Sequence, residues 1–327
     1  MLSRHFLRAK ALQSVYAYVT TGENNPLGGE KNFEYNISHL NELGVMQLST
    51  LPQFVYIAER MIDDAKQKFM PTEEDLNPNM RLVNNRFIQC LADNLEYKRL
   101  EQQMQIDWSG DFDSFRSAYL TFRSSETYKD YLADPNDCYE TDHQFALVLF
   151  KYLMNHELLR ESFISRSLLW DDDFDQVAQY NFQMIREYTE DQFDESSAIM
   201  LMHDTRVEKD VEAYQFALDL FRNTIRHMKE NEDLIRKFLQ NWDFDRIAFI
   251  DMLLLNMAIN ELMYCPSIPE RVTVDEYIEL SKEFSTDKSK LFINGVLDKM
   301  LLELRKDGKI VKTGRGLYNP NIDSTDE

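Results

Sequence analysis

Two arginines and a histidine stand at the start of the chain, in the stretch SRHFLRAKALQSVYAYV (3–19). Its apolar spacing predicts a helix over residues 3–20, on which Arg4 and Arg8 lie one turn apart on the same face, with His5 beside them. Guanidinium planes bind phosphate and stack on unpaired bases, so this face is a candidate RNA contact. The alternative is a solvated basic face, although positive charge at a helix N-terminus opposes the helix dipole.

A second candidate surface surrounds the stretch LFINGVLDKM (291–300). Phe292 stands at the edge of the apolar stripe of this predicted helix, where it can either pack or stack on a base. Asn294 can present its amide at the same edge. Lysines around the start of the helix can contact phosphates, or can be ordinary solvated side chains. These lysines are Lys282, Lys288 and Lys290.

Gly295 stands inside this helix, where glycine costs about 1 kcal/mol relative to alanine. It falls opposite the apolar stripe, in line with Leu291 and near Leu302. We therefore expect another backbone to approach the helix at Gly295, in a tight helix–helix contact.

No arrangement of catalytic residues is visible. The motifs of serine hydrolases, nucleotide-binding loops and zinc proteases are absent, and acidic pairs arise by chance in a chain with 57 acidic residues. Cys90, Cys138 and Cys265 are far apart and are expected to be reduced, half-buried thiols. The cluster WDDDFDQ (170–176) is interpreted as a solvated helix start, because it lacks the glycine and terminal glutamate of a calcium loop. We expect no enzyme, no metal and no cofactor.

The composition favours long helices. Only 9 of the 327 residues are glycine and 8 are proline, while 43% are hydrophobic, which is enough for a core. The most apolar run, 247–263, includes Asp251 and Glu261, so it is expected to be a buried core helix that does not cross a membrane. The N-terminus lacks a secretory signal, and a transit peptide ranks below RNA contact as its interpretation. We predict a cytoplasmic, all-α protein.

The net charge of −21 restricts the possible ligands. A uniformly negative surface would repel nucleic acid, so an RNA role requires a local basic patch.

Breaks in the helical pattern divide the chain. The stretch 20–32 gathers Gly, Asn and Pro and should end the first helix. A long acidic helical region, 33–200, follows. Its breaks are predicted at 70–79, 107–111 and 133–137.

A second helical block begins near residue 206. Thr273 and Glu276 have the spacing of a capping box, which predicts that a helix opens there and ends near Phe284. The basic tail, 306–327, has no apolar period and is expected to be mobile. The other predicted helices cover 207–229, 231–240, 244–263 and the LFINGVLDKM stretch.

Three stretches together resemble the NusB family of transcription antitermination proteins. In the first helix, Arg4, His5 and Arg8 occupy arginine-motif positions. YQFALDLFRNTI (214–225), leading to NWDFDRI (241–247), is similar to the middle helices of the family. The most specific match is IPERVTVDEYIELSKEFSTDKSKLFINGVLDKM (268–300). The remaining matches in the first helix are Ala11, Gln13, Val15 and Tyr16.

The resemblance implies a NusB-like helical domain formed by residues 1–20 and 205–305, interrupted by an acidic helical insertion, 21–204, of unknown role. It implies binding of boxA-type RNA in ribosomal RNA transcripts. The implied partners are a NusE-type small-subunit ribosomal protein and the RNA polymerase antitermination complex, with no chemical reaction.

A second hypothesis follows from two departures from the family pattern. The first helix has fewer arginines than typical members, and the chain is strongly acidic. The protein would then be a NusB-fold adaptor whose insertion binds a basic partner or RNA polymerase, without specific RNA binding. The insertion could also cover Arg4 and Arg8.

Overall fold

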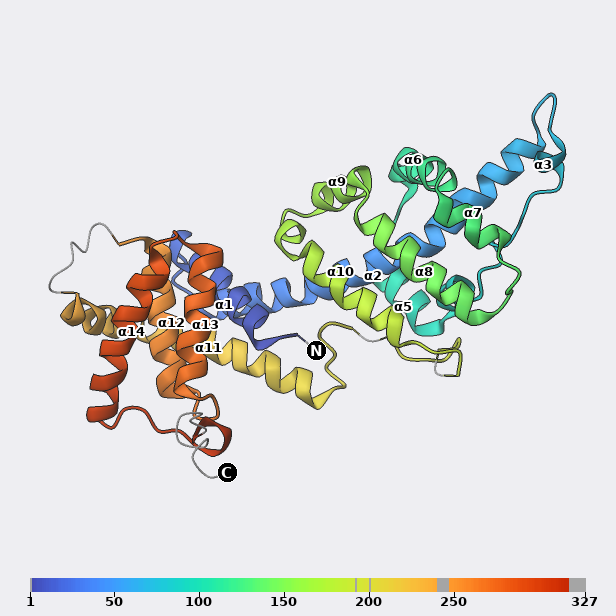
Figure 1. The fold of residues 1–327 in the computed structure, drawn as a ribbon. Coiled ribbons are helices and arrows are strands. Elements are labelled where there is room, and N and C mark those ends of the chain that lie inside the picture. Colours follow the sequence, from blue (N-terminus) through green and yellow to red (C-terminus); the bar gives the residue numbers. More distant parts are fainter. Residues whose placement is uncertain (1, 192, 200, 240–246, 318–327) are drawn as a thin grey trace. The chain divides into compact units, whose positions relative to one another are not determined.

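The structure is a computed structural model that describes residues 2–191, 193–199, 201–239 and 247–317. Within these ranges the regular elements are helices and no strand is present, which confirms the all-α prediction (Figure 1). The chain divides into two compact units. The first unit contains residues 1–37 and 203–327, and the second unit contains residues 38–202.

The first unit contains the candidate RNA-contact residues and is built around a central helix. Its helices are α1 (Arg4–Thr20), the start of α2 (Pro26–Lys66), α11 (Glu208–Phe238), α12 (Phe249–Tyr264), α13 (Glu270–Phe284) and α14 (Ser289–Lys306), followed by the 3-10 helix η3 (Gly314–Leu317).

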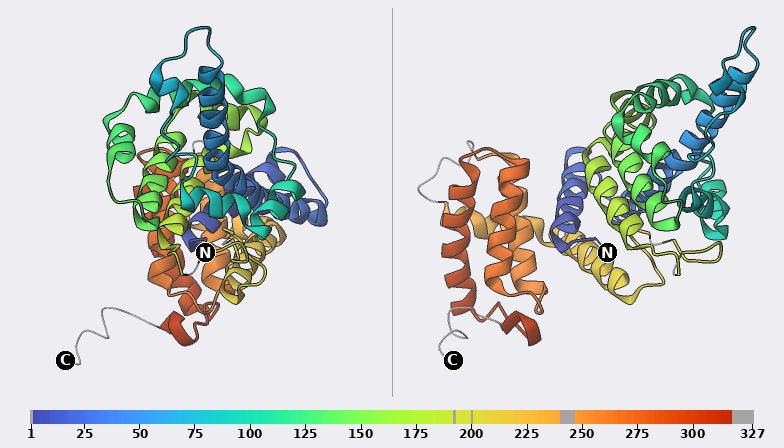
Figure 2. Two further views of the ribbon diagram at one scale, coloured as in Figure 1. Left: turned by 90° about the vertical axis from the view of Figure 1, so that its right-hand side faces the viewer. Right: turned by 45° about the vertical axis from the view of Figure 1, so that its right-hand side comes forward.

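Helix α12 is the core of this unit. Its residues from Asp251 to Leu262 are all buried. A helix that is apolar on every side must be surrounded, and α12 contacts α1, α11, α13 and α14. Helices α12, α13 and α14 lie side by side (Figures 1 and 2). The prediction of a buried core helix in this run is confirmed.

Several predicted boundaries in the first unit are wrong. The helix predicted at 244–263 begins only at Phe249, and 244–246 lies outside the described residues. The break at 20–32 is shorter than expected, because α2 already begins at Pro26. Gly29 is needed inside that helix: a Cβ atom there would lie 2.7 Å from the Tyr18 ring and 2.9 Å from Phe221. The two helices predicted at 207–229 and 231–240 form one helix, α11.

The start of α13 also differs from the prediction. The helix begins at Glu270, after Pro269, which fixes an extended conformation at the N-cap position. Thr273 is therefore inside the helix, where its hydroxyl donates to a buried carboxylate instead of capping.

The tail beyond α14 is also more ordered than the sequence predicts. The Thr313 amide donates to the Pro266 carbonyl at 2.9 Å, and Lys312 Nζ donates to the Cys265 carbonyl at 3.1 Å. Gly316 is buried so closely that a Cβ atom would lie 2.0 Å from the Pro266 oxygen. The prediction of a mobile tail is thus wrong for 312–317, while 318–327 lies outside the described residues.

The second unit is a helical body with an aromatic core. Trp108 packs edge-on against Phe115 and Phe163, with ring centroids 5.0 and 5.3 Å apart. Its elements are the rest of α2, α3 (Glu73–Leu76), α4 (Arg86–Asp93), α5 (Leu95–Gln103), η1 (Ser109–Asp111), α6 (Phe112–Arg123), α7 (Glu126–Ala133), α8 (Tyr139–Met154), α9 (Glu157–Arg166) and α10 (Leu169–Glu187).

All three cysteines are free, as predicted. Cys90 and Cys265 are half-buried, but Cys138 is exposed, because it directly precedes α8 at the surface of the second unit. None of the helices in the described ranges is both long and apolar enough to cross a bilayer.

Candidate nucleic-acid interface

Helix α1 begins where its sequence offers a cap. The Ser3 hydroxyl accepts a hydrogen bond from the Phe6 amide at 3.1 Å, which satisfies one of the free amides of the first turn. Arg4 follows directly and is exposed. Its guanidinium carbon lies 5.4 Å from the centre of the Phe216 ring of α11, a cation–π distance. Arg4 is therefore held on an aromatic support and is open to solvent.

Arg8 has a different role from the one that its spacing predicts. Its side chain is 1% exposed, and Nε and Nη2 donate to the two oxygens of Glu261 at 2.7 Å each. Thr273 and Tyr277 donate to the same carboxylate at 2.9 and 3.2 Å. Burial opposes the charge of Arg8, but the Glu261 carboxylate outweighs it and raises the pKa of Arg8. In this structure Arg8 holds α1 against α12 and has no surface for phosphate.

His5 joins α1 to the last turns of α13. Its Nδ1 lies 2.8 Å from Glu276 Oε2, and its Nε2 lies 2.9 Å from Glu283 Oε1. Partial burial disfavours the charged ring, but the two carboxylates favour it more strongly and raise the pKa of His5. Both ring nitrogens are thus engaged within the protein. Carboxylates of α13 neutralise this end of α1.

Asp251 of α12 fixes the turn between α13 and α14 through hydrogen bonds. Its two carboxylate oxygens accept hydrogen bonds from Ser285 at 2.6 Å and from Ser289 at 2.8 Å. Because Asp251 is buried, these two hydroxyls supply the hydrogen bonds that its charge requires. The turn that presents Lys288 and Lys290 is therefore well defined.

The three predicted lysines are all exposed. Lys282 forms an ion pair with Glu279 one turn back on α13, whereas Lys288 and Lys290 form no ion pair within the described residues. Phe292 and Asn294 are half-buried on the first turns of α14. The side chain of Phe292 is thus neither a core residue nor a fully open platform.

The prediction for Gly295 is wrong. The residue is exposed, and a Cβ atom built on it would meet nothing within 4 Å. Among the described residues no helix packs there, because α14 contacts its neighbours through the opposite stripe, which includes Ile293 and Leu297.

The structure brings most of the candidate residues into one region of the first unit. The contact between His5 and Glu283 sets the start of α1 beside the last turn of α13, which contains Lys282. The turn to α14 follows five residues later and presents Lys288. Exposed cations near a half-buried aromatic ring can bind a nucleic-acid backbone and stack on a base. Arg8 is excluded from this surface by burial.

Sequence reasoning missed three residues that build the region: Glu261, Asp251 and Phe216. A signal for the two acids was present, because a carboxylate inside an apolar run must find a buried partner. Phe216 gave no such signal, since its stripe on α11 also fits ordinary packing.

The acidic charge of the chain is unevenly divided. The second unit contains 14 basic and 30 acidic residues, a net charge of −16. The first unit contains 22 and 27, a net charge of −5. The unit that contains the candidate interface is thus much closer to neutrality than the whole chain.

Comparison with known proteins identifies the family. The NusB family profile matches residues 174–302. The transcription antitermination protein NusB of Salinibacter ruber (strain DSM 13855 / M31) is 45% identical over 111 residues, which are 34% of this chain and 69% of that protein. The NusB of Natranaerobius thermophilus is 34% identical over 125 residues, 38% of this chain and 88% of that protein. The chain belongs to the NusB family.

Two further proteins are similar to this chain. The NusB of Chloroherpeton thalassium is 36% identical over 113 residues, which cover 35% of this chain and 54% of that protein. A solved structure of T. maritima NusB is 26% identical and covers 49% of this chain and 89% of that chain, with a TM-score of 0.27.

The family match is not evenly spread over the site. It begins in α10, in the second unit, and ends in α14, so it includes Lys282, Lys288, Lys290, Phe292 and Asn294 but not α1. The family places the chain among transcription antitermination proteins.

Proposed function

We propose that the protein binds boxA-type RNA of ribosomal RNA transcripts in the cytoplasm, together with a NusE-type ribosomal protein, as part of the RNA polymerase antitermination complex. The observation that supports this most is the pair of exposed lysines, Lys288 and Lys290, at the turn between α13 and α14 in a member of the NusB family, with the start of α1 joined to α13 through His5. No chemical step is involved.

The proposed contacts have distinct roles. Arg4, on its Phe216 support, and the two unpaired lysines Lys288 and Lys290 would bind phosphates. Phe292 would stack on a base, and Asn294 would offer its amide to a base edge. Lys282 would have to leave Glu279 to take part. His5 would position α1 through Glu276 and Glu283.

The test is a titration of labelled boxA-like RNA and of a scrambled RNA, with and without the NusE-type protein, at low and moderate salt. Arg4→Ala and Lys288→Ala/Lys290→Ala should weaken boxA binding. For single-stranded RNA, each lost phosphate contact should reduce the slope of log K against log salt by about 0.7. Lys129→Ala/Lys151→Ala, which removes two exposed lysines of the second unit, is the matched control.

A second candidate function is that of an adaptor without specific RNA binding. It is favoured by the net charge of −16 on residues 38–202, which suits a basic protein partner or RNA polymerase. The same titration separates the two functions. Equal affinity for boxA and scrambled RNA in the presence of the partner protein would reject RNA recognition and leave the adaptor function.

A further inference from the structure

An open groove lies on the second unit, between α7 and α8. Its volume is about 480 Å³, several times that of one side chain. Apolar groups form most of it, among them Pro135 and Val148, and Val148 is 46% exposed on α8. Exposed apolar surface next to a cavity of this size is typical of a binding site for part of another molecule.

The floor of the groove is made of two buried rings, those of Tyr131 and Phe145, each 5% exposed. The rings of Tyr131 from α7 and Phe145 from α8 are stacked, with centroids 3.7 Å apart and planes at 13°. The Tyr131 hydroxyl donates to Asp142 Oδ1 at 2.9 Å and accepts from the Asn85 side chain at 3.1 Å. The floor is thus held in place by a buried network, and binding would cost little reorganisation.

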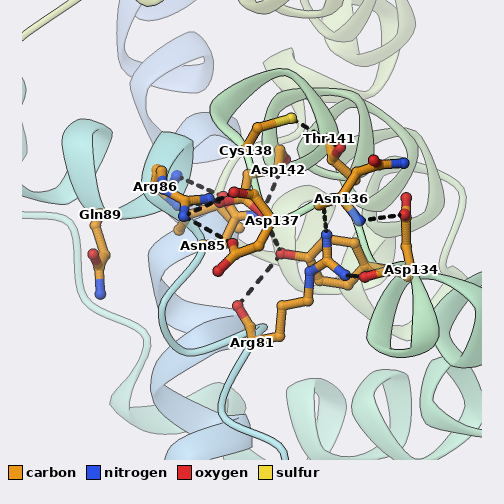
Figure 3. Close-up of polar contacts among 12 residues, drawn as sticks. Arg81, Asn85, Arg86, Gln89, Asp134, Asn136, Asp137, Cys138, Thr141 and Asp142 are labelled. Atoms are coloured by element: carbon orange, nitrogen blue, oxygen red, sulfur yellow. Dashed lines mark hydrogen bonds and ion pairs between the residues drawn. The ribbon is translucent and has the colours of Figure 1, made fainter.

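The rim is held by Arg81. This arginine donates to the backbone carbonyl of Asp134 and, at 2.6 Å, to that of Asn136, and its guanidinium carbon lies 4.6 Å from the centre of the Tyr131 ring (Figure 3). The Asn136 amide in turn donates to the Asp134 side chain at 2.8 Å. The loop after α7 therefore keeps one shape at the mouth of the groove.

The charge at the mouth selects the ligand. Asp130 and Asp134 both line the groove, and neither side chain is in an ion pair within the described residues, whereas the arginine at the rim, Arg81, donates its hydrogen bonds to the backbone carbonyls of Asp134 and Asn136. The unit around them has a net charge of −16. Phosphate groups would be repelled, whereas lysine and arginine side chains would be attracted.

We propose that this groove binds a basic segment of a partner protein. An apolar side chain of the segment lies against the exposed side chains of Val148 and Pro135, above the Tyr131–Phe145 floor, and flanking lysine or arginine side chains pair with Asp130 and Asp134. The site belongs to the second unit alone, and it does not depend on RNA contact by the first unit.

The experiment uses the full chain and a fluorescein-labelled peptide, GSKLKGS, with anisotropy as the readout. Two carboxylates at a solvent-exposed rim are together worth about a tenfold change in affinity, so Asp130→Asn/Asp134→Asn should weaken binding by about that factor. Val148→Arg, which places a cation in the groove, should abolish it. Glu157→Gln/Glu161→Gln, the same charge change on α9, should leave it unaltered.

Peptide variants test the apolar contact and the charged contacts separately. GSKSKGS should lose the apolar contact and bind at least tenfold more weakly. GSELEGS should not bind. BoxA RNA affinity and the melting temperature of each protein variant are measured in parallel, and both should remain at wild-type values. Wild-type protein that binds GSKLKGS but not boxA RNA would contradict the proposed function and leave the groove proposal standing.

Two results would overturn the groove proposal. One is equal peptide affinity for wild type, the Asp130/Asp134 variant and the Val148 variant, which would mean non-specific attraction to an acidic protein. The other is the absence of binding by GSKLKGS at concentrations up to about 1 mM, together with the absence of binding by the peptides in which Ile, Met or Phe replaces its Leu.

Discussion

Arg8 of α1 and Glu261 of α12 form a bidentate ion pair that is closed to solvent, with both hydrogen bonds at 2.7 Å and side chains that are 1% and 0% exposed. Glu261 also accepts from Thr273 and Tyr277 of α13. One buried carboxylate thus joins three helices of the first unit. The start of α1, where Arg4 lies, depends on this joint for its position.

Removing one partner of such a pair leaves the other charged and buried. We expect Arg8→Ala to lower the free energy of unfolding by about 3–5 kcal/mol. Arg8→Lys should also destabilise, because an ammonium cannot make the paired hydrogen bonds of a guanidinium. Arg4→Ala should change stability by less than about 0.5 kcal/mol, since Arg4 is exposed. Urea unfolding followed by circular dichroism measures all three.

The stabilities of the Arg4 and Arg8 variants are also needed to interpret the RNA titration. A protein with both Arg4 and Arg8 replaced would lose RNA binding through instability, whatever Arg4 does. Wild-type stability of Arg8→Ala would contradict the structural role of the pair and return Arg8 to the list of RNA contacts.

Gly295→Ala should stabilise the protein by about 0.5–1 kcal/mol. The residue lies in the interior of α14 with open space where the Cβ atom would be, so alanine adds helix propensity without a clash. Thermal melting measures the gain, and Asn294→Ala serves as a neighbour control. If the variant is more stable but binds boxA RNA more weakly, the glycine is there for a ligand that approaches α14. A loss of stability would mean that a helix of this chain does pack at Gly295.

The sequence shows the angle of a side chain on a helix but not its depth in the protein. Arg4 and Arg8 share a face by their spacing, as predicted, yet one is exposed and the other is buried. The difference arises along the helix axis, because Arg8 lies against Glu261 of α12, whereas Arg4, one turn earlier, contacts the Phe216 ring and stays exposed. No local pattern in residues 3–19 contains that information.

Gly295 and the net charge illustrate the same limit. The two-sided apolar pattern of α14 correctly predicts a helix, but whether Leu291 and Leu302 meet another helix depends on where other helices lie. The total charge of −21 is a sum over the chain, and most of it belongs to residues 38–202. The packing around Gly295 and the distribution of the charge can both be interpreted only once the tertiary arrangement is known.

His5 should make the stability of the protein depend on pH. Its pKa is raised above 6.5 in the folded state by Glu276 and Glu283, against the effect of partial burial. A raised folded-state pKa contributes stability that is fully present below the unfolded value and is lost as the pH rises through the folded value. His5→Gln should therefore destabilise most near pH 6 and progressively less toward pH 8.5. A wild-type-to-variant difference that stays constant over this range would rule out the charged pair.

Cys138 should be the first cysteine to react with alkylating reagents. A hydrogen bond with the Thr141 side chain, and backbone amides at the start of α8, lower the pKa of Cys138. Burial raises the pKa of Cys90, and it raises that of Cys265 to about 12. Because the thiolate is the nucleophile, native protein at pH 7.5 should be modified by iodoacetamide at Cys138 at least about tenfold faster than at the other two.

Peptide mass spectrometry after short exposures gives the three rates separately. Thr141→Val should slow the alkylation of Cys138 and leave the alkylation rates of Cys90 and Cys265 unchanged, since the Thr141 hydroxyl contacts Cys138 Sγ at 3.3 Å. Equal modification of all three cysteines in the native protein would mean that the first unit around Cys265 and the second unit around Cys90 both open on the timescale of the reaction. Because Thr141 also lines the groove between α7 and α8, GSKLKGS should slow labelling of Cys138 if the peptide binds where we propose.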